Sequence, residues 1–274
     1  MEDAHIAVPN LLPDGSLFAV LDGHGGSEVA QYVSDRLPNI IQQSPYIKAK
    51  KWEEAMEQAF RTMDTTIMSE SGHKDLYEYY KKATHDDYDL KETELPYHVG
   101  CTAVLALITN GEIIVANAGD SRCVMGRKNE TVELSEDHKP SNEIELQRIA
   151  HANGFVKDDR INGSLNLSRS LGDFHYKSNK LLDPYEQLVI SLPDVRIVKL
   201  TNDIDFIVLA CDGIWENLSS KQVVDFVYTK LKANPQIALS LIIEALFDKI
   251  ISPDSFTAPL GCDNMSCIIV QFKK

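Results

Sequence analysis

Hydrophobic residues follow the two-residue period of strands along some stretches of this chain and the spacing of helices along others. Three strand-like runs between 101 and 126 are separated by turns at Asn110-Gly111 and Gly119-Asp120, which predicts an antiparallel meander. Further strand-like runs occupy 16–21, 205–211 and 266–272. Because these runs are connected as hairpins or by long helical stretches, we expect mainly antiparallel sheets with helices packed outside them.

Helical spacing is clearest between 47 and 68, where five large apolar side chains follow one another at steps of four, four, three and four. They form one buried helix face: Trp52, Met56, Phe60, Met63 and Ile67. We also expect helices over 220–231 and 237–251, and one from 27 that ends at Pro38.

Two further stretches are predicted from their polar residues. Asn142-x-x-Glu145 predicts a capped helix over 141–153, which Gly154 would end in a left-handed conformation. Residues 69–97 are charged and weakly periodic, so we interpret them as a helix end and a surface loop. The Asp86-Asp87 pair within them is expected to be a solvated acidic face and not a metal site.

Composition narrows the classes of function. The chain has 274 residues, 27 basic against 41 acidic, and a formal charge of −14, which disfavours nucleic acid as a partner. A phosphorylated substrate would need a local source of positive charge, such as bound metal ions. No run approaches the ~20 apolar residues that span a bilayer, so we expect no membrane association. No Gly/Ser linker or repeat divides the chain, which favours one domain and, we expect, a monomer.

The number and spacing of the cysteines and the first residues of the chain indicate its cellular compartment. The five cysteines are odd in number and form no C-x-x-C pair, as is typical of a reducing compartment. The first ten residues lack the features of a secretory signal. We therefore expect a cytoplasmic protein, with nuclear entry left open.

Aspartates recur at strand ends. Asp22, Asp120 and Asp212 directly follow strand-like runs, and Asp263 precedes the last one. Any one of them could be a turn residue or a helix cap. Together they could converge on one cleft, where a bound cation would relieve their mutual repulsion. Carboxylates with few histidines suit Mg²⁺ or Mn²⁺ better than zinc, and two such ions can activate water and hold a phosphoryl group.

At this point the chain resembles the metal-dependent protein serine/threonine phosphatases of type 2C, the PPM family. The resemblance implies a four-layer α-β-β-α sandwich of the α+β class and hydrolysis of phosphoserine and phosphothreonine in proteins. It rests on segments in the family's order across nearly the whole chain: MEDAH (1–5), LDGHGG (21–26), GCTAV (100–104), ANAGDSR (116–122), EDHKPSNEIELQRI (136–149), RINGSLNLSRSLGDFHYK (160–177), LACDGIWE (209–216) and DNMS (263–266).

The resemblance also implies roles for residues. Asp22 resembles the residue that bridges two metal ions, Gly23 one that offers its carbonyl oxygen, and Asp212 and Asp263 the other carboxylate ligands. Asp120 matches a ligand of a weaker third ion, and Glu2 and Asp3 match residues that hold metal-bound waters.

We also expect particular roles for three histidines and two glycines. His24 resembles the family's general acid, whereas His5 and His138 are expected to be structural. Gly25 and Gly26 are expected to leave room for a bulky phosphoprotein and to let the chain turn into a helix. Residues Ser168 to Asp173, within a turn-rich region over about 155–190, resemble a mobile flap beside the cleft that influences substrate choice.

One departure from the family pattern concerns the start of the chain. Family members carry a phosphate-binding arginine and a strand before MEDAH, and here MEDAH begins the sequence. From this we expect an exposed sheet edge and a raised KM or little turnover.

Other phosphatase classes fit less well. The second metal-dependent serine/threonine class needs an Asn-His-Glu motif, and cysteine-dependent phosphatases need an arginine six residues after the nucleophile; neither pattern is present. The alternative function is a catalytically impaired pseudophosphatase that acts as a regulatory binding module.

Overall fold

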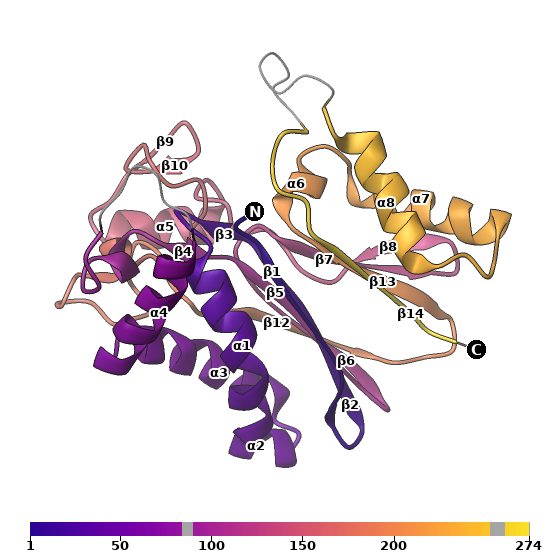
Figure 1. Ribbon diagram of the computed structural model, residues 1–274, viewed down its shortest axis with the longest axis horizontal. Coiled ribbons are helices and arrows are strands. Elements are labelled where there is room, and N and C mark those ends of the chain that lie inside the picture. Colours follow the sequence, from indigo (N-terminus) through magenta and orange to yellow (C-terminus); the bar gives the residue numbers. More distant parts are fainter. Residues whose placement is uncertain (84–89, 253–260, 274) are drawn as a thin grey trace.

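The computed structural model describes residues 1–83, 90–252 and 261–273, and two stacked sheets form its centre (Figure 1). The first sheet has the order β1 (Ala4–Leu12), β2 (Gly15–Leu21), β5 (Ala103–Thr109), β6 (Glu112–Ala118) and β12 (Asp194–Lys199). The second has the order β14 (Cys267–Gln271), β13 (Ile204–Ala210), β7 (Arg122–Arg127) and β8 (Glu130–Glu133). Every ladder within these two sheets is antiparallel.

Helices cover the outer faces of both sheets. The first sheet carries α1 (Glu28–Gln43), α2 (Pro45–Lys48), α3 (Trp52–Ile67) and α4 (Glu70–Lys82), and the second carries α6 (Asp212–Trp215), α7 (Ser220–Ala233) and α8 (Leu239–Ile250). The four-layer α-β-β-α prediction is confirmed. No helix in the described ranges is long and apolar enough to cross a bilayer.

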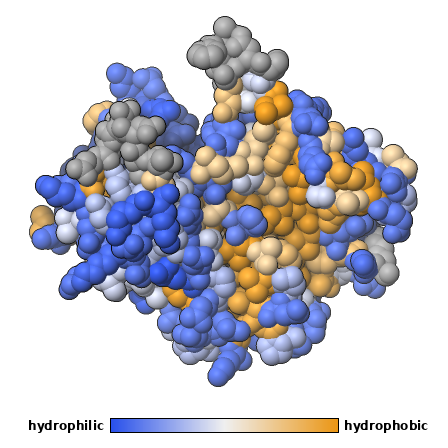
Figure 2. Space-filling model, viewed as in Figure 1, coloured by the Kyte–Doolittle hydropathy of each residue, from blue (hydrophilic) through white to orange (hydrophobic). Residues whose placement is uncertain are grey.

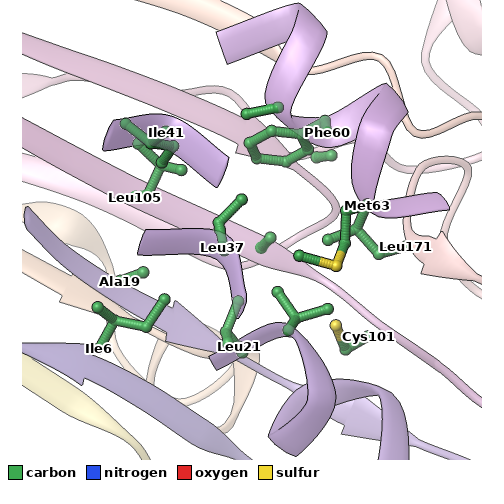
Figure 3. Packing of buried hydrophobic residues seen from close by; sticks show 14 of the residues in the cluster. Ile6, Ala19, Leu21, Leu37, Ile41, Phe60, Met63, Cys101, Leu105 and Leu171 are labelled. Atoms are coloured by element: carbon green, nitrogen blue, oxygen red, sulfur yellow. The ribbon is translucent and has the colours of Figure 1, made fainter. Parts of the chain in front are cut away.

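In the central strands, alternate side chains pack into two different hydrophobic cores. On β2, Leu17, Ala19 and Leu21 face the helices, whereas Val20 faces the second sheet. Figure 3 shows Ala19 and Leu21 beside Leu37 of α1, on the helix side of the first sheet. The second sheet repeats this pattern: Ile207 and Leu209 face the first sheet, and Phe206, Val208 and Ala210 face α7 and α8. β2 and β13 are therefore buried on both faces, which explains their nearly continuous hydrophobic runs.

Shorter elements lie at one end of the sandwich. A small sheet joins β11 (Leu171–Gly172), β4 (Gly100–Cys101) and β3 (Gly23–His24). Near it lie η1 (Leu95–Tyr97), α5 (Glu143–His151), the hairpin β9 (Val156–Lys157) and β10 (Arg160–Ile161), and η2 (Phe174–Lys177).

Each main sheet has one edge strand on the near side of the molecule, β1 in the first and β14 in the second (Figure 1). Figure 2 shows hydrophobic residues gathered over this part of the surface, whereas hydrophilic residues cover the side of α3 and α4.

The prediction that a helix ends at Pro38 is wrong, because α1 continues through Pro38 to Gln43. Proline removes one backbone donor from a helix. Leu37 and Ile41, on either side of Pro38, are both fully buried against the first sheet. Their burial on the helix face stabilises the segment despite the lost hydrogen bond.

The region from 47 to 97 also differs from expectation. The expected helix is divided into α2 and α3 at Lys50, which has a φ of 54°. The apolar stripe from Trp52 to Ile67 is buried on α3, as predicted. Residues 70–82 form the helix α4, capped by Ser69 and held by buried Leu76 and Tyr80, where a helix end and loop were expected. The Asp86-Asp87 pair lies outside the described residues.

The expected meander is only partly correct, because β5 and β6 form a hairpin but β7 crosses to the second sheet. Asn142 is the N-cap residue of α5, as predicted, but the hydrogen bonds expected of the Asn142-x-x-Glu145 cap are not formed. Asn142 makes no side-chain cap bond, and Glu145 points into the interior toward arginines. At the other end of α5, Asn153 takes the left-handed conformation expected of Gly154.

Candidate active site

The four strand-end aspartates line one pocket of about 220 Å³ at the end of the two sheets. Asp22 follows β2, Asp120 follows β6, Asp212 is the first residue of α6 after β13, and Asp263 precedes β14. Asp22, Asp120 and Asp212 therefore lie at the ends of strands with buried residues, whereas Asp263 is exposed before the edge strand β14. The remaining lining residues of this carboxylate pocket are Glu2, Gly23, His24, Thr102, Asn166 and Leu167.

Backbone and hydroxyl hydrogen bonds fix the pocket walls to one another. The Thr102 N–H donates to the Asp22 carbonyl oxygen at 2.9 Å, and the Glu2 N–H donates to Asn264 Oδ1 at 2.6 Å. Thr102 Oγ1 and Ser121 Oγ lie 2.8 Å apart in the interior. Segments from both ends of the chain and from both sheets thus meet at the pocket with little freedom.

Glycines permit two close approaches of the chain to itself. A Cβ at Gly23 would lie 2.3 Å from the carbonyl oxygen of Glu2, so only glycine lets the first residues pack against β3. A Cβ at Gly25, where φ is +70°, would lie 2.3 Å from the carbonyl oxygen of His98. The space at Gly25 is thus filled by the protein's own backbone, and the expectation that it leaves room for a phosphoprotein is wrong there.

Carboxylates in the pocket repel one another. The pKa of Asp22 is raised to about 10, first by burial and then by the like charges of Asp212, Asp3 and Asp120. Burial also raises the pKa of Asp212 to about 7, with contributions from Asp120 and Glu216. Without a cation, this pocket holds protons that ordinary aspartates would have lost.

Asp3 lies beside the pocket, and its pKa is raised first by burial. Both of its carboxylate oxygens are buried without a hydrogen-bond partner in the described part of the chain. Buried unpaired carboxylates are costly, and a hard divalent cation with its water ligands would satisfy them. The donors are oxygens, so the set fits Mg²⁺ or Mn²⁺ better than zinc.

As they stand, the described residues contain no group of three or more His, Cys, Asp or Glu side chains already arranged to hold a metal ion. None of the described residues that line the pocket is an arginine or a lysine. Lys139 lies outside this lining, and its ammonium donates to Asp120. The described lining therefore offers a phosphate no arginine or lysine side chain.

His24 contacts a residue whose role the sequence did not indicate. Its Nε2 lies 2.7 Å from Oδ2 of Asp173. Burial lowers the pKa of His24, but the neighbouring Asp173 carboxylate outweighs burial and raises it. Asp173 was expected only as part of a flap. No local signal could reveal the contact, since the two residues are 149 positions apart.

The other predicted residues lie elsewhere. His5 is exposed on β1, and His138 is buried, with Nδ1 accepting from the Gly119 N–H at 3.1 Å. Neither lines the pocket. Residues 168–173 are all buried, so this part of the expected flap is interior structure. Lys139 and Glu216, which act electrostatically on the pocket, are two residues that the sequence reasoning missed.

Comparisons with known proteins agree on one family. A family model described as "Protein phosphatase 2C" matches residues 1–257, a span that includes every candidate site residue except Asp263. "Probable protein phosphatase 2C 3" of Paramecium tetraurelia is 43% identical over 276 residues, which cover 100% of this chain and 88% of the relative. "Protein phosphatase 2C homolog 2" of Schizosaccharomyces pombe is 42% identical and covers 99% of this chain and 69% of the relative.

Solved structures share the fold. A phosphatase from Toxoplasma gondii superposes with a TM-score of 0.78 at 22% identity, over 99% of this chain and 88% of that one. A serine-threonine phosphatase 2C from the same organism gives a TM-score of 0.75 at 22% identity, over 99% and 90%. At this identity the likeness concerns the fold alone.

Proposed function

This chain belongs to the protein phosphatase 2C family, and on that premise we propose how its residues divide the work of a metal-dependent protein serine/threonine phosphatase. The observation that carries the proposal is the meeting of Asp22, Asp120, Asp212 and Asp263 with His24 in one pocket. Nothing in the pocket favours the pseudophosphatase alternative, since no carboxylate of the expected set is missing.

The carboxylates hold the cations. Asp22, Asp212 and Asp263 would bind two Mg²⁺ or Mn²⁺ ions, with the carbonyl oxygen of Gly23 as a further donor. Asp120 would bind a weaker third ion, and Glu2 and Asp3 would hold water ligands. A pair of divalent cations, when bound, supplies the positive charge that holds a phosphoryl group and makes water acidic enough to attack it near neutral pH.

His24 completes the reaction. As water attacks phosphorus, the bond from phosphorus to the seryl or threonyl oxygen breaks, and that oxygen takes the bonding electron pair. A proton from His24 neutralises it, so an alcohol and inorganic phosphate leave. The side chain of His24 is 26% exposed, which leaves part of the ring accessible to a substrate.

We propose further properties from the charge of the chain and the burial of its thiols. The chain acts as one catalytic domain and as a monomer, on phosphorylated proteins and not on nucleic acid, as its charge of −14 favours. The turn-rich region over about 155–190 influences substrate choice. Buried thiols at Cys101, Cys123 and Cys211 suit the cytoplasm or the nucleus.

The direct test is Mn²⁺-dependent phosphate release from a phosphothreonine peptide. We expect release that requires the metal and that Asp212→Asn lowers by orders of magnitude. Asp14→Asn, at an exposed turn outside the pocket, is the matched control and should retain activity. Release without metal, or undiminished release by Asp212→Asn, would contradict the assignment.

A further inference from the structure

The contact between His24 and Asp173 is built into the fold. Nε2 of His24 lies 2.7 Å from Oδ2 of Asp173, whose side chain is only 6% exposed. The two residues meet at the small sheet, in which β4 lies between β3, which ends at His24, and β11, which precedes Asp173. A buried contact across this sheet depends on tertiary structure and not on a local turn.

Neighbouring groups hold Asp173 in place. Its N–H donates to the carbonyl oxygen of Val99 at 3.0 Å, and Ser170 Oγ donates to its Oδ2. Its φ of 55° is left-handed, a conformation that aspartate and asparagine tolerate better than most residues. A Cβ at Gly100 would lie 2.3 Å from Oδ2 of Asp173 and 2.6 Å from Nε2 of His24. Glycine at 100 therefore keeps the space for this pair clear.

Residues on both sides of Asp173 are tied to α3, Gly172 through its backbone and Lys177 through its side chain. Asp64 on this helix accepts from the Gly172 N–H at 3.0 Å through Oδ1 and from Lys177 Nζ at 2.6 Å through Oδ2. Lys177 Nζ also donates to the carbonyl oxygen of Ser170 at 2.8 Å. The Asp173 carboxylate therefore cannot shift far without breaking buried hydrogen bonds.

The contact with Asp173 determines which ring nitrogen of His24 is free to transfer a proton. An ionised carboxylate accepts hydrogen bonds and cannot donate them, so Nε2 carries the hydrogen in the contact with Asp173. Nδ1 has no hydrogen-bond partner among the residues that the structure describes, and His24 lines the carboxylate pocket.

We infer that Asp173 is a positioning residue that orients the His24 ring so that Nδ1 delivers the proton to the leaving oxygen, which rests on the acid role proposed above for His24. In the step, the Nδ1–H bond breaks and the O–H bond of the alcohol forms, while the electron pair of the broken P–O bond goes to that oxygen. The Nε2–H bond stays intact against Asp173, and the ring is left neutral.

The first test compares leaving groups. Asp173→Asn keeps the shape and tolerates the left-handed backbone. We expect its kcat to fall roughly 10- to 100-fold on phenyl phosphate, with little change in KM. On p-nitrophenyl phosphate, whose more acidic alcohol needs less protonation, the fall should be under about threefold. Equal losses on both substrates, or a change in KM alone, would overturn the inference.

Asp194→Asn is the matched control, since Asp194 also pairs with a histidine, His138, at 3.1 Å but outside the pocket. Any loss it causes should be equal on both substrates, and a loss as selective as that of Asp173→Asn would count against a specific role for Asp173.

A double-mutant cycle separates this inference from the proposed function. His24→Ala should itself show the dependence on leaving group; if it does not, the acid role of His24 fails and the inference with it. If His24→Ala shows the dependence and Asp173→Asn does not, only the inference fails. In the His24→Ala background, Asp173→Asn should have no further effect, and a full additional loss would show that it acts elsewhere.

A measurement on the unmodified protein covers the case in which Asp173→Asn does not fold. Nitrogen-15 NMR of histidine-labelled protein reports which ring nitrogen carries hydrogen. Neutral His24 should carry it on Nε2, and hydrogen on Nδ1 would overturn the inference.

Discussion

Two groups of carboxylates in this protein differ in the charges that surround them. In the carboxylate pocket, burial and like charge raise the pKa values of Asp22 and Asp212. In a second group, the Glu145 cluster, each carboxylate meets a protein cation and its pKa is lowered. That cluster consists of Glu145, Arg148, Arg169, Asp194 and His138.

Hydrogen bonds show how completely the Glu145 cluster is satisfied. Arg169 donates to Glu145 Oε1 and to Asp194 Oδ1, each at 2.7 Å. Arg148 donates to Glu145 Oε2 at 2.5 Å, and Ser168 Oγ donates to the same oxygen at 2.7 Å. No such cation faces Asp22 or Asp3 among the described residues. The comparison teaches that arginines of the chain itself neutralise one cluster, whereas the carboxylates of the other carry charge that bound cations would neutralise.

The largest expected effect comes from neutralising the pocket. Asp22→Asn should lower phosphate release roughly 10³-fold, a loss of several kcal/mol in transition-state stabilisation. Because the pKa of Asp22 is about 10, its side chain is uncharged at neutral pH without metal, and asparagine replaces it with little change in charge. The metal-free protein should therefore unfold at the same temperature as the wild type or a higher one. Kinetics and calorimetry check the two expectations, and a large fall in Tm without metal would contradict the comparison.

Removing an arginine from the Glu145 cluster should lower the free energy of unfolding. Arg169→Met leaves Glu145 and Asp194 each with one cation fewer, and removing one partner of a buried ion pair costs about 3 to 5 kcal/mol. Urea denaturation measures the loss. A change below about 1 kcal/mol would mean that the cluster is no better satisfied than an exposed ion pair.

Metal removal tests the pocket without mutation. A cation at a free concentration 100 times its Kd should stabilise the folded protein by about 2.7 kcal/mol, and a chelator should reverse this. The shift should persist in Arg169→Met and shrink in Asp22→Asn. Equal shifts in the two variants, measured by thermal unfolding, would place the cation outside the carboxylate pocket.

The pH dependence of stability should have opposite signs in the two regions. Asp22 has a pKa of about 10 in the folded protein against an ordinary value of 3.8, so stability without metal falls as pH rises through this range. Glu145 and Asp194 have lowered pKa values, so their contribution is present at neutral pH and is lost as pH falls below about 4.

Urea midpoints measured between pH 3 and 9 in a chelator would reveal both trends. Asp22→Asn should flatten the alkaline side and Glu145→Gln the acid side. An unchanged alkaline side in Asp22→Asn would contradict the raised pKa.

The smallest effect is expected at an exposed ion pair. Lys74 Nζ and Glu70 Oε1 lie 2.7 Å apart on the surface of α4, in full contact with water. Lys74→Met should leave the urea midpoint unchanged within error, because solvent screens the charges. A shift comparable to that of Arg169→Met would show that burial does not explain the difference between the clusters.

Local patterns predicted much of the fold. The strand runs and the apolar stripe from Trp52 to Ile67 match the structure, because side-chain period reports which face is buried. The same reasoning was wrong at Pro38, where packing of α1 outweighs one lost hydrogen bond, and at α4, whose buried face is only Gly72, Leu76 and Tyr80. It also placed Glu145 in a helix cap, because Arg169, one of the two arginines that bind it, lies 24 residues away.

The sequence by itself determined which chemistry is available: four aspartates at strand ends and a histidine beside glycines, with no run of basic residues near them. Only the tertiary structure decided which carboxylates face one another, which meet arginines, and that Asp173 holds His24. The physical reason is the separation along the chain over which each kind of interaction acts. Strand period and turn preference act over a few residues, whereas electrostatic pairing depends on distances in space between segments as far apart as Glu2 and Asn264.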